Sequence, residues 1–154
     1  MSAPSSFNIA AEATLPVSRE TVWNALQDPE VLQACIPKCE SISRVGGDHY
    51  DLLFSARFGP ARISLKGKMH LSDVQPVERY KLHFAGEAFG SRGGGAAQVQ
   101  LLEQGPDTLI RYNLDVFVEG RVAMLGAPLV RGAVERGLEK FFAAFETHIK
   151  RGRS

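Results

Sequence analysis

Two cysteines four positions apart are the first residues whose type and spacing could support chemistry. Cys35 and Cys39 stand in the stretch ACIPKCES, with Pro37 between them. Thioredoxin-like redox motifs place their cysteines one residue closer, as C-x-x-C, and a zinc site would need two further ligands. Pro37 cannot continue a helix and favours an extended Ile36. We therefore expect a bend in the chain at which two thiols pack, with neither a redox pair nor a metal site.

The other residues that could support catalysis form no recognisable site. His49, His70, His83 and His148 lack the spacing of a zinc finger, although His70 and His83 could face each other across a hairpin on its solvent side. The run GSRGGGA at 90–96 lacks the GK[ST] of a phosphate-binding loop, so we expect it to permit a tight turn and close backbone approach. Nucleophile motifs and inward pairs of carboxylates are also missing. The sequence thus predicts no catalytic residue, no metal ligand and no cofactor.

Length and composition indicate one globular domain, residues 1–154, with a basic end at 146–154. The chain has 154 residues, of which 44% are hydrophobic and 23% charged, as is ordinary for a globular protein. Its net charge of +1 gives no electrostatic reason to expect a nucleic-acid partner. We find no secretory signal and no apolar run of membrane-spanning length. The expectation is a cytoplasmic protein, peripheral at most at the inner face of the cell membrane.

Hydrophobic periodicity predicts the order of the elements. Alternation over residues 7–15 is typical of a strand. Ser18 then begins one short helix, and Asp28 with Pro29 begins a second that ends before Pro37. About six strands follow from residue 41, each with one buried and one solvent face; the alternation is clearest over 50–58, 61–71, 80–86, 95–101 and 110–118. Helical spacing returns from about 128 to 149.

This order predicts an α+β fold. We expect a curved antiparallel sheet of about seven strands around a long C-terminal helix, with two short helices after the first strand. A helix over 128–149 would be roughly 33 Å long at about 1.5 Å per residue, which matches strands of ten residues. One long helix can therefore cover one side of the sheet.

Several stretches, spread in order along almost the whole chain, resemble the G-subunit family of carbon monoxide dehydrogenase. The family belongs to the START-like (SRPBCC) superfamily, whose fold is the helix-grip. The stretches are VWNALQDPEVLQACIP, FGPARISLKGKMHL, GSRGGGAAQVQL, TLIRYNLDVFVEGRVAMLG and LEKFFAAFE. One departure is Lys38, where the family usually has glycine. If that position needs a positive φ, lysine is strained there.

The resemblance implies an accessory protein of a molybdenum-containing carbon monoxide dehydrogenase or a related hydroxylase. Such proteins are implicated in bringing that enzyme to the inner face of the membrane. The resemblance also implies a cavity for an apolar ligand between the sheet and the long helix.

The residues themselves give a separate argument for a cavity. Small residues on the predicted inner face of the sheet, such as Gly67, Gly86 and Ala97, stand opposite small residues of the last helix, such as Gly137. Close helix–sheet packing is the alternative. An empty hollow of ~300 Å³ would cost roughly 7 kcal/mol, which is a large part of a total stability of about 5–15 kcal/mol. A closed cavity would therefore need an occupant.

The predicted lining is almost wholly apolar. Tyr112 is the one inward residue expected to form a hydrogen bond, with a carbonyl or hydroxyl of the ligand. A quinone, which joins an apolar body to two carbonyls, fits this lining and the need to pass electrons to the membrane; a lipid tail is the rival. The expected ligand-binding residues are Phe54, Ile63, Leu65, Met69, Leu82, Phe84, Val99, Tyr112, Leu114, Val116, Leu125, Leu129 and Phe141.

The sequence therefore favours a non-enzymatic accessory protein that binds a quinone or lipid, contacts hydroxylase subunits and associates weakly with the inner membrane surface. Two alternatives remain. One is a small START-like cyclase or dehydratase that uses Tyr112 on an aromatic or polyketide substrate. The other is a co-chaperone-like interaction domain without a ligand.

Overall fold

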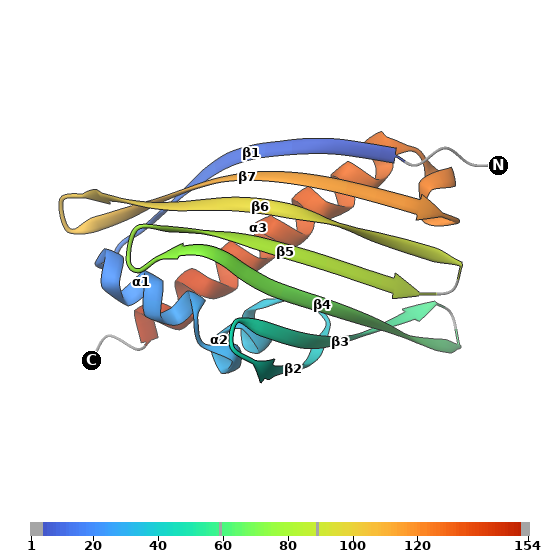
Figure 1. The fold of residues 1–154 in the computed structure, drawn as a ribbon, viewed down its shortest axis with the longest axis horizontal. Helices are drawn as coiled ribbons and strands as arrows, with labels where there is room; N and C mark the ends of the chain where they lie inside the picture. The colour runs from blue at the N-terminus through green and yellow to red at the C-terminus, as the bar shows by residue number, and fades with distance from the viewer. Residues whose placement is uncertain (1–4, 59, 89, 152–154) are drawn as a thin grey trace.

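The computed structural model describes residues 5–58, 60–88 and 90–151 (Figure 1). Three α-helices, one short 3-10 helix and seven strands make up this part of the chain. Their order is β1 (Ser5–Leu15), α1 (Arg19–Leu26), α2 (Pro29–Cys35), β2 (Cys39–Gly46), β3 (His49–Phe58), β4 (Ala61–Gln75), β5 (Arg79–Ala88), β6 (Ser91–Gln104), β7 (Asp107–Gly120), η1 (Val122–Leu125) and α3 (Ala127–Arg151).

The seven strands form one antiparallel sheet in the order β1-β7-β6-β5-β4-β3-β2. The chain therefore adds neighbours by hairpins from β2 to β7, and β1 closes the far edge by pairing with β7. The long helix α3 crosses one face of the curved sheet, with α1 and α2 near the end where α3 finishes (Figure 1). The predicted helix-grip α+β fold is confirmed.

Local signals start the two short helices where the sequence predicted. The Ser18 hydroxyl accepts a hydrogen bond from the backbone N–H of Thr21 at 3.3 Å and caps α1. The Asp28 carboxylate accepts from the backbone N–H of Glu30 at 2.9 Å and caps α2, which has Pro29 in its first turn. Both caps satisfy backbone donors that a helix leaves unpaired at its start.

The core is densest at the end of the molecule where α3 finishes. Phe145 and Ile149 of α3 are buried there with Val22 and Trp23 of α1. In the first half of α3, by contrast, Val130 is the only buried residue among those that the structure describes. The helix is thus held tightly at its C-terminal end and less tightly at its start.

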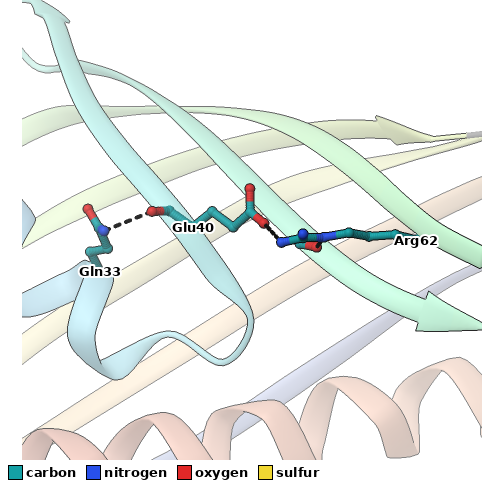
Figure 2. Close-up of polar contacts among 4 residues, drawn as sticks. Gln33, Glu40 and Arg62 are labelled. Carbon is teal, nitrogen blue, oxygen red and sulfur yellow. Dashed lines mark hydrogen bonds and ion pairs between the residues drawn. The ribbon is translucent and has the colours of Figure 1, made fainter.

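The turn between α2 and β2 is tied to the sheet by polar contacts (Figure 2). The Gln33 side chain donates to the Glu40 carbonyl at 2.8 Å and accepts from the Ile42 N–H at 3.4 Å. The Glu40 carboxylate in turn pairs with the Arg62 guanidinium on β4. Within this turn Lys38 has a φ of 62°, so the position does take a positive φ.

The two cysteines flank this turn as free thiols. Cys35 is buried and Cys39 is half-buried, with its Sγ donating to the Ser41 carbonyl at 3.5 Å. Burial raises the pKa of both thiols, so both favour the protonated form.

Candidate functional site

A hollow of about 450 Å³, the inner chamber, lies between the middle of the sheet and α3. The inward faces of β3 to β7 form one wall, the middle of α3 forms the other, and α1, α2 and the turn after α2 close one end. Its lining residues are Leu26, Leu32, Ile36, Pro37, Tyr50, Met69, Leu71, Tyr80, Leu82, Phe84, Ala97, Val99, Ile110, Tyr112, Leu114, Val116, Val134, Gly137, Leu138, Phe141 and Phe142. Apart from tyrosine hydroxyls, these side chains are apolar.

A second hollow of about 810 Å³, the outer chamber, continues from the first toward η1. The two chambers share Met69, Phe84 and Val116. The outer chamber is lined by apolar residues of β3 to β7 and by Val122 and Leu125 of η1, together with the charged Lys68, Glu87, Arg92 and Arg121. Val122 is 37% and Leu125 60% exposed, so this chamber meets the solvent beside η1.

Three glycines on neighbouring strands form a part of the outer-chamber wall that has no side chains. Gly67 on β4 pairs with Gly86 on β5, which pairs with Gly93 on β6. A Cβ at Gly93 would come within 2.9 Å of the Phe117 carbonyl oxygen, so close strand packing requires glycine there. At Gly67 and Gly86 the nearest atoms to an added Cβ are 3.4 Å away, which is ordinary contact. These two glycines widen the hollow without being required by the backbone.

Three tyrosines of the inner chamber differ in their surroundings. The Tyr50 hydroxyl accepts a hydrogen bond from the Arg44 guanidinium at 2.7 Å. Tyr80 is 7% exposed, and burial raises its pKa well above the usual range. Tyr112 is half-buried and stacks on Phe142 with ring centroids 5.4 Å apart. Its pKa is raised by burial and, further, by the nearby carboxylates of α3.

The structure places most of the predicted ligand-binding residues on these chambers. Met69, Leu82, Phe84, Val99, Tyr112, Leu114, Val116 and Phe141 line the inner chamber. Phe54, Leu65 and Leu125 line the outer chamber. Leu129 lines neither chamber and is 56% exposed. The next residue of α3, Val130, is the one that is buried, and Leu129 therefore points outward. The side chain of Ile63 lies outside the described residues.

The sequence analysis missed several lining residues. Leu26, Leu32 and Ile36 come from α1, α2 and the turn after them, whose position over the hollow depends on tertiary packing. Val134, Leu138 and Phe142 share the sheet-facing stripe of α3 with Phe141, and their helical spacing could have identified them. Tyr80 lies on the predicted inward face of the strand over 80–86, so the alternation of that strand was sufficient to include it among the lining residues.

Three histidines form a ladder on the outer face of the sheet. His70 on β4 pairs with His49 on β3 and with His83 on β5. The rings stack, with centroids 5.1 Å apart for His49 and His70 and 4.5 Å apart for His70 and His83. Within the described ranges, no group of three or more His, Cys, Asp or Glu is arranged to hold a metal ion. Parallel rings do not point their nitrogens at one shared point.

A comparison with protein families identifies the chain. The family model for the G subunit of carbon monoxide dehydrogenase (CoxG) matches residues 12–150. The chain belongs to this family. The match includes both chambers and reaches from β1 almost to the end of α3. No curated protein sequence matches the chain.

Solved structures show that this CoxG family member shares its fold with START-like proteins. A conserved protein from Geobacillus kaustophilus superposes with a TM-score of 0.88 at 24% identity, covering 94% of this chain and 96% of that one. A START superfamily protein from Mycobacterium smegmatis gives 0.73 at 15% identity, with 94% and 97% covered. The Zhui aromatase/cyclase from Streptomyces sp. R1128 gives 0.64 at 13% identity, with 96% and 95% covered. At these identities the likeness concerns the fold alone.

No helix in the described part of the chain combines the length and apolar character needed to cross a membrane.

Proposed function

We propose that this protein is a non-enzymatic accessory protein of a molybdenum-containing carbon monoxide dehydrogenase-type hydroxylase. It binds an apolar ligand, a quinone or a lipid, and links the enzyme to the membrane. Family membership supports the partner, and the chambers support the ligand. The observation that carries the proposal is the pair of adjoining hollows, of about 450 and 810 Å³, within the size range of ligand sites.

The chemistry of the lining favours a mostly apolar ligand. Water in the inner chamber would find few polar groups to bond, and an empty apolar void costs stability. An apolar occupant removes both costs. Among apolar ligands we favour a quinone, because Tyr112 places a hydroxyl beside the ring of Phe142 and within reach of a carbonyl.

The outer chamber offers a route for such a ligand. Val122 and Leu125 line it and are also exposed, so one apolar surface runs from the solvent into the hollow. Met124 is 75% and Leu129 56% exposed in the same region. Contact of this end with a membrane surface would let an apolar molecule enter without crossing water. The basic Lys150 and Arg151 at the other end of α3 would add only a weak attraction to anionic lipid.

Extraction and titration test the proposal. Protein purified from its own host is extracted with organic solvent, and the extract is analysed by mass spectrometry. Delipidated protein is then titrated with a short-chain quinone and with a fatty acid. We expect a co-purifying apolar molecule and saturable binding of the quinone, weakened severalfold in Tyr112→Phe. Recovery of no apolar molecule together with no binding of either compound would end the proposal.

An aromatase/cyclase among proteins of the same fold supports one alternative, a small cyclase or dehydratase. Tyr112 would then act on a bound aromatic or polyketide substrate as a proton donor. Like an ordinary tyrosine it is protonated at neutral pH, and the upward shift of its pKa does not change that. Turnover of such a substrate by the wild type and its loss in Tyr112→Phe would favour this alternative, whereas binding without turnover favours the carrier.

A further inference from the structure

All three tyrosines of the chain line the same chamber, and one of them is paired with a protein group through its hydroxyl. The Tyr50 hydroxyl binds the Arg44 guanidinium. The Tyr80 and Tyr112 hydroxyls form no hydrogen bond with any residue that the structure describes. Neither hydroxyl is among the described side-chain atoms that are enclosed without a partner, so each stays accessible to water or to a ligand.

Tyr80 is the more deeply placed of the two. Its side chain is 7% exposed, whereas Tyr112 is half-buried. The Tyr80 ring packs edge-to-face against the Trp23 ring of α1, with the ring centroids 5.5 Å apart. This contact fixes the position of the Tyr80 ring. Burial keeps the phenol protonated. The result is a rigid O–H donor in an otherwise apolar region.

Strand register places Tyr80 and Tyr112 on either side of Val99 in the same wall of the chamber. Tyr80 on β5 is opposite Val99 on β6, and Val99 is opposite Tyr112 on β7. All three side chains line the inner chamber. Since neighbouring strands are about 4.8 Å apart, the two tyrosine backbones lie about 10 Å apart. A ligand lying over Val99 therefore has one hydroxyl on each side.

We propose that Tyr80 donates the hydrogen bond that selects and orients the ligand. The acceptor is a carbonyl-type group of the ligand, held in the inner chamber. The apolar remainder of the ligand is directed toward the outer chamber. This inference rests on the proposed function and adds to it a specificity-determining residue and an orientation. It also predicts selection against ligands of the same shape that lack an acceptor, because the hydroxyl would then stay unpaired.

Two probes of similar shape test the role of Tyr80. One is menadione, a planar methylnaphthoquinone with two carbonyls. The other is 2-methylnaphthalene, which has a similar ring system without carbonyls. Each is titrated by calorimetry into the wild type, Tyr80→Phe and Thr147→Val. Thr147→Val is the control, because it removes a hydroxyl from the exposed side of α3, outside both chambers.

We expect Tyr80→Phe to weaken menadione binding roughly three- to tenfold, as loss of one neutral hydrogen bond does. Thr147→Val should leave binding of both probes unchanged, and Tyr80→Phe should not weaken binding of 2-methylnaphthalene. Tyr80→Phe should also unfold at a temperature no lower than the wild type, because it removes a hydroxyl that has no protein partner among the described residues. An infrared spectrum of menadione bound to the wild type should show a carbonyl band shifted to lower frequency than in hexane.

The outcomes separate this inference from the proposed function. If both probes bind, Tyr80→Phe has no effect and the carbonyl band is unshifted, the role of Tyr80 is overturned while an apolar carrier stands. If neither probe binds the wild type, the role of Tyr80 is overturned, and the carrier is decided separately by the solvent extraction and the fatty-acid titration. A Tyr80→Phe variant that fails to fold leaves the infrared band of the wild type as the deciding measurement.

Discussion

Lys38 carries local backbone strain at a position where the resembling family usually has glycine. Its φ of 62° lies in the left-handed region, which costs an L-residue with a Cβ roughly 1–2 kcal/mol. The turn is fixed on both sides, because the Lys38 carbonyl accepts from the Ser55 N–H at 3.0 Å and Gln33 binds Glu40. The surrounding contacts therefore hold the lysine in a conformation that glycine adopts freely.

We predict that Lys38→Gly stabilises the protein by about 1 kcal/mol. Glycine removes the left-handed penalty, and its greater freedom in the unfolded chain offsets part of the gain. Urea denaturation measures the change. Lys38→Ala is the control, since it removes the exposed side chain but keeps the Cβ and should give no such gain. A glycine variant less stable than the alanine variant would show that φ is not the cause.

At the scale of the elements, local patterns predicted the strands and helices, and pairing between distant segments decided the site. Alternation and the caps at Ser18 and Asp28 depend on residues close in sequence, so they could be identified from the sequence. The glycine row of Gly67, Gly86 and Gly93 depends on the register of three strands. The run at 93–95 was correctly expected to allow close backbone approach: at Gly95 a Cβ would lie 1.8 Å from the Asp115 carbonyl oxygen.

The histidine ladder on β3, β4 and β5 makes the stability of the protein depend on pH. Burial lowers the pKa of His70, and the neighbouring His83 and His49 lower it further. His83 also forms a hydrogen bond with the Ser72 hydroxyl at 2.9 Å. A histidine whose pKa is lower folded than unfolded binds fewer protons in the native state, so acid favours unfolding.

We predict that stability falls as pH decreases from the unfolded pKa of His70, about 6.5, toward its lower native value. Above that window the contribution of His70 is constant. Urea denaturation at pH 7.5 and pH 5 should show a larger loss for the wild type than for His70→Gln, which keeps a polar side chain that does not titrate. Equal losses in the two proteins would mean that the ladder does not contribute to acid sensitivity.

At the scale of the whole molecule, the protein is packed at one end and hollow toward the other. Phe145 and Ile149 hold the end of α3 against α1, whereas the middle of the helix, over 134–142, borders the inner chamber. The sequence predicted a hollow from small residues that face each other, but it could not predict the partners of individual groups. Tyr50 binds Arg44 while Tyr80 has no such partner among the described residues, and only the packed structure distinguishes them.

This asymmetry gives a prediction for hydrogen exchange. Amides of α3 near Phe145 and Ile149 should exchange only on global unfolding, whereas those over 130–138 should exchange faster through local opening, because fewer buried contacts hold them.

A saturating apolar ligand such as menadione fills the hollow beside 134–138. At a free concentration 100 times its Kd it should add about 2.7 kcal/mol to global stability. Beyond that uniform gain, exchange over 130–138 should slow further, toward the global rate. Exchange measured by mass spectrometry with and without menadione tests this. Equal protection along α3 before ligand is added would contradict a hollow that loosens one end of the molecule, since a solid interior would hold the helix evenly.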